Sequence, residues 1–509
     1  MNDLKTAIID IGSNTVRLVM YKYSKDKGLH EFGNIKTVAR LRTHLLPNGE
    51  MSEQGIQILA DTLNSFKEIL QDYNVTDINA CATAAVRQAK NNTQIIERMK
   101  QETGIEIVIL SEEEEAYFGF LAVVNSMDTR SAVTIDIGGG STEITLFINK
   151  KLQHTHSFPF GTVSLKQKFV EGTIMNEQER KNMHDYVLKQ FKKLDWIQGV
   201  SLPIVAIGGS SRNIAQIHQH RIDYPISGLH QYEMSYEQLN ELKNHLGQMN
   251  FETLIQLDGL SSDRADIIVP AMEVFTTLME VVGTGEFQVS KKGLREGVII
   301  NRVLKSDSEA FDKYNVFEEN ARRMTFAYGR SDQEANTLFK LADKLYKECC
   351  ALNFFKYNDE NRNLLTKAAK VYAIGEYIEL DSSSQHTFYL LANQSIAGMT
   401  HVDRVKLALL ASYKNRDYFR RFAMPFNEWI SREVLRELRD FGALLKFVYA
   451  LNVSKRNIVK DVKLEQGDGV VHIYVTTSIR PVSEIYEVER TKKHLERIFK
   501  QEVCIHFDM

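Results

Sequence analysis

The feature that most constrains this chain is a strand–turn–strand pattern that occurs twice. Residues 8–19 read Ile-Ile-Asp-Ile-Gly-Ser-Asn-Thr-Val-Arg-Leu-Val, and residues 134–146 read Thr-Ile-Asp-Ile-Gly-Gly-Gly-Ser-Thr-Glu-Ile-Thr-Leu. In each copy an apolar strand runs into Asp-Ile-Gly, small residues form a turn, and a second apolar strand follows. The copies lie one small α/β domain apart, so we expect two similar lobes that face each other across a cleft.

Strand and helix patterns alternate around both copies, which is typical of an α/β fold. Helices are expected at 55–71, 94–103, 177–194 and 263–282, and strands at 78–83, 105–110 and 203–207. After about residue 305 glycine becomes rare, and amphipathic patterns at 332–352, 362–378 and 402–413 predict a helical domain. The tail predicts a hairpin of strands 461–465 and 470–477, a helix at 482–500 and a strand at 503–507. The expected domains are therefore 1–127, 128–304, 305–450 and 451–509.

Composition narrows the class of protein. The 509 residues include 63 Lys and Arg against 66 Asp and Glu, a net charge of −3, so the chain as a whole is no polycation for nucleic acid or membranes. A local basic groove would not show in that sum. The N-terminus has no secretory pattern, the apolar stretch at 265–285 is interrupted by acids and a proline, and the four cysteines lack zinc spacing. We predict a cytoplasmic protein that binds neither nucleic acid nor membranes.

Both Asp-Ile-Gly turns contain the parts of a phosphate site, because their glycines let backbone N–H groups approach an anion. Asp10 and Asp136 precede the glycines and are candidates for holding a divalent cation. Two ordinary β-turns are the alternative, but a lobe-sized repeat favours the phosphate site. The loop Gly208-Gly209-Ser210-Ser211 between a strand and a helix is a third, weaker anion-binding signal.

Two further features allow more than one interpretation. The run Ser111-Glu112-Glu113-Glu114-Glu115 opens a helix, so its acids suit capping, although one facing the cleft would be a natural general base. Arg87 closely follows a strand and could bind phosphate with both guanidinium nitrogens, but a surface charge is the simpler interpretation.

Together, several motifs resemble the exopolyphosphatase and guanosine pentaphosphatase (Ppx/GppA) family, in the right order over residues 5–304. These motifs are Asp10-Ile-Gly-Ser-Asn-Thr, Ala82-Thr-Ala-Ala-Val-Arg, the acidic run 111–116, Asp136-Ile-Gly-Gly-Gly-Ser-Thr-Glu and Leu294-Arg-Glu-Gly. The resemblance implies two ribonuclease H-like (actin-like) lobes with an interlobe cleft, then an all-helical domain and a small α+β domain. The helical domain resembles a degenerate His-Asp phosphohydrolase: residues 368–375 lack the His-Asp pair and only His386 remains nearby, so no second metal site is expected. Glu112 departs from the family, which usually has glycine there.

The resemblance also implies residue roles. Glu115 would activate water, while Asp136 and Glu143 would position that water or Mg²⁺. Asp10 is a further candidate metal ligand beside those two. The candidate phosphate-binding residues, from the loops and the resemblance together, are Ser13, Asn14, Arg87, Gly138, Gly139, Gly140, Ser141, Gly209 and Ser210.

The resemblance predicts a Mg²⁺-dependent, homodimeric exopolyphosphatase acting on inorganic polyphosphate. A long polyanion needs a basic path away from the cleft, although each candidate cluster also suits a solvated face. The candidates are Arg416, Arg420, Arg421 and Lys414, and also Lys291, Lys292 and Arg295. The alternatives are a guanosine pentaphosphate 5′-phosphohydrolase, an actin-like ATP phosphotransferase, or a non-catalytic polyphosphate- or alarmone-binding protein. If guanosine pentaphosphate is not the substrate, it is a candidate regulator.

Overall fold

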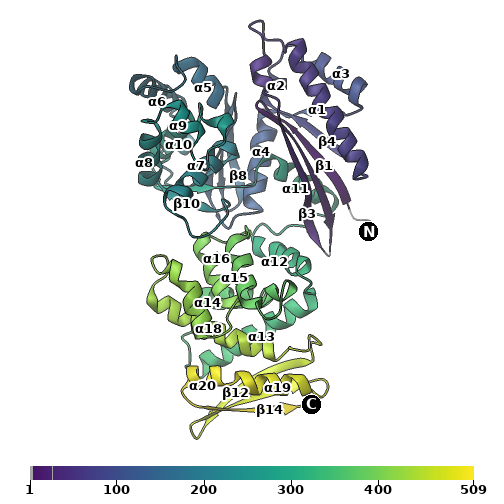
Figure 1. The fold of residues 1–509 in the computed structure, drawn as a ribbon, viewed down its shortest axis with the longest axis vertical. Helices are drawn as coiled ribbons and strands as arrows, with labels where there is room; N and C mark the ends of the chain where they lie inside the picture. Colours follow the sequence, from purple (N-terminus) through teal and green to yellow (C-terminus); the bar gives the residue numbers. More distant parts are fainter. Residues whose placement is uncertain (1–3, 26) are drawn as a thin grey trace. The chain divides into compact units, whose positions relative to one another are not determined.

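The computed structural model describes residues 4–25 and 27–509, which form two compact units (Figure 1). The first unit contains the described residues up to Tyr224 together with Leu229–Val316, and the second contains Pro225–Gly228 and Phe317–Met509. Among the described residues, no helix is both long and apolar enough to cross a membrane.

The first lobe of unit one is built on a five-stranded sheet in the order β3-β2-β1-β4-β5. Its strands are β1 (Leu4–Ile11), β2 (Thr15–Ser24), β3 (Gly28–Val38), β4 (Asp77–Ala82) and β5 (Ile107–Ile109). One face packs on α1 (Glu53–Asp72) and α3 (Asn92–Thr103), and the other on α4 (Glu112–Val124) and α11 (Leu294–Ser306), as Figure 1 shows. The apolar spacing that predicted the first helix is the buried face of α1, where Leu59, Leu63 and Phe66 are at most 1% exposed.

The second lobe has a six-stranded sheet in the order β10-β11-β9-β6-β7-β8. Its strands are β6 (Ala132–Ile137), β7 (Thr142–Ile148), β8 (Lys151–Phe158), β9 (Ile204–Ile207), β10 (Tyr232–Ser235) and β11 (Glu286–Val289). Its helices are α5 (Thr162–Phe169), α6 (Glu177–Phe191), α7 (Gly208–Arg221), α8 (Tyr236–Leu246), α9 (Phe251–Ile255) and α10 (Ile268–Val282). In both lobes three antiparallel strands are followed by a parallel one, β4 beside β1 and β9 beside β6, so the predicted pair of similar α/β lobes is confirmed.

The helix expected at 263–282 is shorter than predicted, because α10 begins at Ile268. Residues Ser262–Arg264 form a separate 3₁₀ turn, and the side chains of Asp263 and Arg264 bond to other elements. Pro270 then lies in the first turn of α10, where a missing N–H costs no helical hydrogen bond.

The second unit is a helical part followed by a small sheet. Its helices are α12 (Val316–Ala327), α13 (Asp332–Ala351), α14 (Asp359–Lys370), α15 (Ser383–Asn393), α16 (His401–Ala411), α17 (Arg416–Ala423) and α18 (Arg432–Ala450). The sheet β12-β13-β14 consists of β12 (Val459–Gly467), β13 (Val470–Thr477) and β14 (Glu502–Asp508), with α19 (Val482–Thr491) and α20 (Lys493–Phe499). The predicted hairpin is confirmed, and its turn residues Asp468 and Gly469 have φ of 51° and 78°.

Two of the predicted helices in this unit are interrupted. The one expected at 362–378 ends at Lys370, because Ala373 adopts φ 56° and donates its N–H to the carbonyl of Ala411 at 2.9 Å. The one expected at 482–500 divides into α19 and α20 at Lys492.

Candidate active site

The turns β1–β2 and β6–β7, one from each lobe, meet at a cavity of about 180 Å³. Its lining contains the predicted residues Asp10, Ser13, Asn14, Glu115, Asp136, Gly138, Gly139, Ser141, Glu143 and Gly209. Gly140 and Ser210 adjoin lining residues; Gly140 faces the Arg42 side chain and Ser210 accepts from Arg264. Residues separated by up to 200 positions in the chain thus come together at one site.

Backbone contacts fix the shape of both turns. Gly12 N–H donates to the carbonyl of Thr15 at 3.0 Å, and Gly138 N–H donates to the carbonyl of Ser141 at 2.9 Å. Gly161 presses against the second turn, so that a Cβ there would lie 2.4 Å from the carbonyl oxygen of Gly138. Gly208 has φ +93°, and a Cβ on it would lie 2.6 Å from Asp136 Oδ1. These two positions therefore require glycine.

The acidic run both caps α4 and places one carboxylate at the cavity. Ser111 caps α4 and Glu114 completes the capping box, with its Oε2 accepting from Ser111 N–H at 2.9 Å. The next residue, Glu115, lines the cavity, and its side chain is only 13% exposed.

The sequence favoured a surface position for Arg87, but the side chain is only 15% exposed. Its Nη1 donates to Glu115 Oε2 and to the carbonyl of Leu110, the latter at 2.9 Å. The cavity lining in the described chain includes Thr83 and Ala84 from the same segment but not Arg87. In this structure Arg87 therefore acts on Glu115, while its predicted contact with phosphate stays a prediction.

Burial raises the pKa of three carboxylates of the cavity, those of Glu115, Asp136 and Glu143. Desolvation raises the pKa of Glu115 to about 7, against the lowering effect of Arg87. Desolvation also raises the pKa of Asp136 to about 6. The pKa of Glu143 lies well above its ordinary value, because that side chain is buried and because Glu115 and Asp136 repel its charge. A carboxylate with a pKa near 7 is suited to general base catalysis.

Three arginines that line the cavity were not expected there from the sequence. Arg212 and Arg264 line the cavity but were not predicted, and Arg264 Nη1 lies 3.3 Å from Ser210 Oγ. Arg295 was assigned to a basic path, yet it lines the cavity and its Nη1 donates to Asp10 Oδ2 at 2.9 Å. Residues 208–211, expected as a loop, form the first turn of α7 instead. Arg212 lies one turn into that helix, and this spacing is the signal that could have found it.

Two carboxylates of the cavity suit Mg²⁺, although they do not form a complete metal site by themselves. Among the described residues, no group of three or more His, Cys, Asp or Glu side chains is arranged to hold a metal ion. Asp10 is engaged by Arg295, whereas Asp136 and Glu143 are partners in the β6–β7 register and both line the cavity. Mg²⁺ usually takes one or two carboxylates, with waters and substrate phosphates completing its shell. Asp136 and Glu143 fit such an ion.

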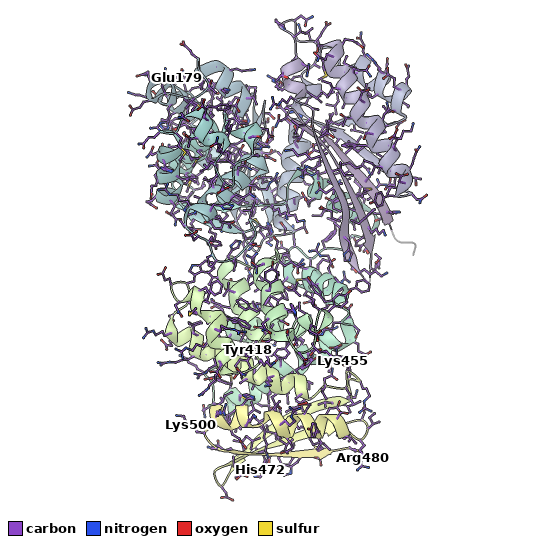
Figure 2. All side chains as sticks on the ribbon, in the orientation of Figure 1. Glu179, Tyr418, Lys455, His472, Arg480 and Lys500 are labelled. Atoms are coloured by element: carbon purple, nitrogen blue, oxygen red, sulfur yellow. The ribbon has the colours of Figure 1, made fainter. Side chains whose placement is uncertain are left out.

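The predicted path residues Arg416, Arg420 and Arg421 lie on α17 of the second unit, the helix of the labelled Tyr418 in Figure 2. The Arg421 guanidinium lies over the rings of Tyr418 and Phe422, with its carbon 4.6 Å from the centre of the Tyr418 ring. A path that joins this helix to the cavity stays a prediction.

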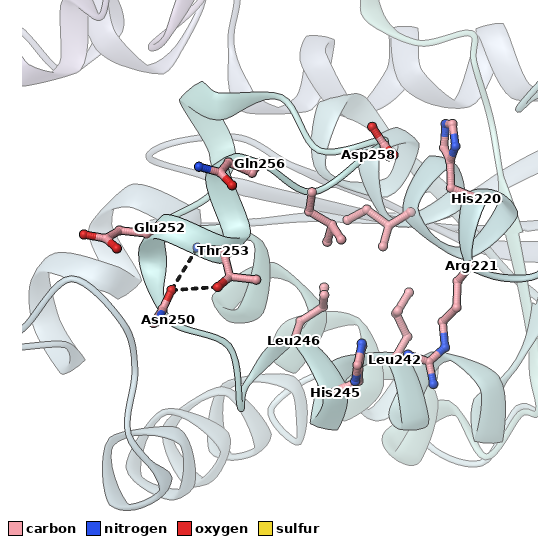
Figure 3. Close-up of a pocket in the computed structure, with 12 residues that line it drawn as sticks. His220, Arg221, Leu242, His245, Leu246, Asn250, Glu252, Thr253, Gln256 and Asp258 are labelled. Atoms are coloured by element: carbon pink, nitrogen blue, oxygen red, sulfur yellow. Dashed lines mark hydrogen bonds between the residues drawn. The ribbon is translucent and has the colours of Figure 1, made fainter.

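A larger cavity, of about 570 Å³, lies in the second lobe between the ends of α7, α8 and α9 (Figure 3). Leu242 and Leu246 contribute to its apolar floor, and its one arginine, Arg221, is paired with Glu241 at 3.2 Å. Asn250 caps α9 by accepting from the backbone and hydroxyl of Thr253. The smaller cavity, with its glycine turns and carboxylates, is therefore the candidate active site.

Comparison with known proteins identifies relatives over most of the chain. Residues 20–306 match the model of the Ppx/GppA phosphatase family, and residues 316–473 match the model of Ppx/GppA phosphatase, domain III. A guanosine-5′-triphosphate,3′-diphosphate pyrophosphatase of Pseudoalteromonas atlantica is 26% identical over 416 residues, 78% of this chain and 77% of that protein. A bifunctional 3-dehydroquinate synthase/phosphatase of Fusobacterium nucleatum is 24% identical over 315 residues, 59% of this chain but only 47% of that protein.

Two solved structures resemble a large part of this chain. A Ppx/GppA family member from Aquifex aeolicus is 27% identical with a TM-score of 0.54, covering 60% of this chain and 99% of its own. An exopolyphosphatase from Cytophaga hutchinsonii is 25% identical with a TM-score of 0.55, covering 59% of this chain and 98% of its own.

Proposed function

The chain belongs to the Ppx/GppA phosphatase family, and from this premise we propose that it is an exopolyphosphatase that removes terminal phosphate from inorganic polyphosphate. The observation that carries the proposal is the cavity between the lobes, where two glycine turns face the carboxylate of Glu115. Backbone N–H groups can hold phosphate oxygens there, while a base with a pKa of about 7 can take a proton from water.

In the proposed reaction, water attacks the terminal phosphorus and Glu115 accepts its proton. One P–O bond to water forms and the bridging P–O bond breaks, which releases inorganic phosphate and a chain shorter by one unit. Arg212, Arg264 and Arg295, all lining the cavity, stabilise the charge on the phosphate oxygens. Mg²⁺ held by Asp136 and Glu143 would supply further charge neutralisation on those oxygens.

A cluster of cations in the second unit favours polyphosphate over a nucleotide. Lys446 Nζ lies 3.3 Å from His494 Nε2 and donates to the carbonyl of Lys414 at 2.7 Å. Burial and the surrounding cations, including Lys446, Arg497, Lys493 and Arg416, lower the pKa of His494 to about 4. Glu487 offsets part of this charge, but burial, Lys493, Lys414 and Arg490 still lower the pKa of Lys446. The cluster therefore favours a further anion, which a long polyanion would supply.

A guanosine pentaphosphate 5′-phosphohydrolase is the second candidate, favoured by the relative from Pseudoalteromonas atlantica, which matches 78% of this chain. Phosphate release from polyphosphate and from guanosine pentaphosphate, measured side by side with Mg²⁺, decides between the two. We expect the higher kcat/KM on polyphosphate, and a higher value on the nucleotide would reverse the assignment. The homodimer and the cytoplasmic location stay predictions.

A further inference from the structure

One carboxylate of the second lobe holds two side chains of the first. Asp263, in the 3₁₀ turn Ser262–Arg264, accepts a hydrogen bond at Oδ2 from Asn14 Nδ2 at 3.0 Å. The same oxygen lies 3.6 Å from Lys36 Nζ, and the Asp263 side chain is only 13% exposed. Asn14 belongs to the β1–β2 turn and Lys36 to β3, so both partners come from the other lobe.

The segment that carries Asp263 is fixed to the body of its own lobe. Asn213 Oδ1, on α7, accepts hydrogen bonds from Ser261 N–H at 2.9 Å and from Ser261 Oγ at 2.8 Å. Gly259, with φ +87°, lies so close to α7 that a Cβ would be 2.7 Å from the backbone of Gln216. Because of these contacts, we expect Asp263 to move with the second lobe rather than as part of a loose loop.

The contact occupies a group that the active site needs. Asn14 lines the cavity and is a candidate phosphate ligand, yet its amide N–H is given to Asp263. Although burial opposes ionisation, Lys36 and Arg264 hold the pKa of Asp263 below its ordinary value, so this side chain is charged at neutral pH. A phosphate oxygen bound at this amide would lie close to the Asp263 carboxylate, and the two negative charges would repel each other.

We infer that Asp263 is an interlobe clasp, which joins the two lobes through Asn14 and Lys36 and is displaced from Asn14 by an arriving phosphate group. The clasp itself follows from contacts between the lobes. Only its displacement rests on the proposed function, since that step takes the cavity as a phosphate site.

Distances between spin labels on the two lobes test the clasp without any ligand. The labels are placed on the full chain at Glu68→Cys in α1 and Lys181→Cys in α6, both exposed sites, with Cys350 and Cys504 replaced by serine. In phosphate-free buffer we expect Asp263→Asn to give a longer mean distance or a broader distribution than the parent chain. Lys36→Met, which removes the partner from the opposite lobe, is expected to act in the same direction.

Asp307→Asn is the matched control. The Asp307 side chain is 14% exposed and, like Asp263, pairs with a lysine, Lys25 at 3.3 Å. It also accepts hydrogen bonds from two neutral donors, Tyr23 Oη at 3.0 Å and Glu309 N–H at 3.4 Å. It lies outside the cavity lining in the described residues, so its loss is expected to leave the label distances unchanged. Unchanged distances in both Asp263→Asn and Lys36→Met, or an equal change in Asp307→Asn, would overturn the clasp.

Titration with inorganic phosphate, followed by calorimetry, tests the displacement. Removing a charge roughly 4 Å from a bound anion in a partly buried site is expected to tighten phosphate binding about tenfold in Asp263→Asn. Phosphate binding in that variant no tighter than in the parent chain contradicts the displacement. If the parent chain binds no phosphate, the proposed function fails, while the label distances still decide the clasp.

Discussion

Glu115 at the start of α4 accepts a hydrogen bond from Arg87 at the end of α2 (Ala84–Arg87), and the two side chains are only 13% and 15% exposed. The arginine holds the carboxylate in one orientation at the cavity wall. Burial of the pair keeps the pKa of Glu115 near 7 in spite of that positive charge. The proposed base is thus ionised in a large fraction of molecules at neutral pH and is still basic enough to accept a proton.

Replacing the proposed base is expected to stop hydrolysis and to preserve binding. Glu115→Gln keeps the shape of the side chain and loses its proton acceptor, so we expect kcat on polyphosphate to fall roughly 10²–10⁴-fold. Glu114→Gln is the matched control, because glutamine also completes a capping box and Glu114 does not line the cavity among the described residues. Phosphate release measures the loss of hydrolysis, and calorimetry measures the binding of polyphosphate. Hydrolysis at the normal rate by Glu115→Gln would contradict the assignment of Glu115 as the base.

The pH dependence of kcat/KM follows from the same residue. Because the base acts in its ionised form, the rate is expected to rise as pH increases through about 7, the pKa of Glu115. Arg87 favours the charged form, so Arg87→Met is expected to raise that pKa and move the rising limb to higher pH. Steady-state rates from pH 5 to 9 check both points. A limb that stays in place in Arg87→Met would show that Glu115 does not set it.

Local patterns predicted the lobes well and the cavity only in part. The two Asp-Ile-Gly turns and the acidic run were found because each is a continuous motif with its own chemistry. Arg295 was misplaced because its partner, Asp10, is 285 residues away and only the packing of α11 against α4 and β1 brings the two together. The end of α14 at Lys370 was not predicted for a similar reason. The apolar spacing continues past Lys370, whereas the hydrogen bond between Ala373 and Ala411 is a tertiary contact.

The buried carboxylates of the cavity are expected to reduce the stability of the fold. The pKa of Glu143 is raised on folding, so its ionised form destabilises the folded state at pH values above the unfolded pKa of about 4.3. Glu143→Gln is therefore expected to raise Tm at pH 8 by about 2–4 °C, with the gain vanishing as the pH falls to about 4. Calorimetric scans at both pH values measure it.

Glu296 provides the opposite case as a control. Despite its burial, Lys292, Arg295 and the N–H of Gly293 hold its pKa below the ordinary value. The ionised Glu296 side chain therefore stabilises the folded state at pH values above its pKa in the unfolded chain. This contribution is lost as the pH falls through its lower pKa in the folded state. Glu296→Gln is thus expected to lower Tm at pH 8, and a rise in both variants would mean that the partners of each carboxylate do not decide the sign.

The basic cluster of the second unit is expected to strengthen the binding of long polyphosphate and not the binding of short chains. With Lys414→Glu and Arg416→Glu together, we expect KM for long polyphosphate to rise about tenfold or more, because two attractive charges become repulsive. KM for tripolyphosphate, a much shorter polyanion, is expected to stay unchanged. Lys460→Glu with Lys463→Glu, on β12, is the control with the same change of charge. Equal effects of both pairs on long chains would indicate net charge rather than this cluster.

The contact of Gly161 with the phosphate turn gives a steric prediction. A methyl group at this position would lie 2.4 Å from the carbonyl oxygen of Gly138 and 2.6 Å from Gly140 N, both backbone atoms that cannot rotate away. Gly161→Ala is expected to displace the turn and lower kcat/KM about 100-fold, since shifts near 1 Å have effects of that size. Gly285→Ala, where a Cβ meets no atom of the described chain within 4 Å, is the control and should retain activity. Normal phosphate release by Gly161→Ala would contradict the role of the second turn in holding the substrate.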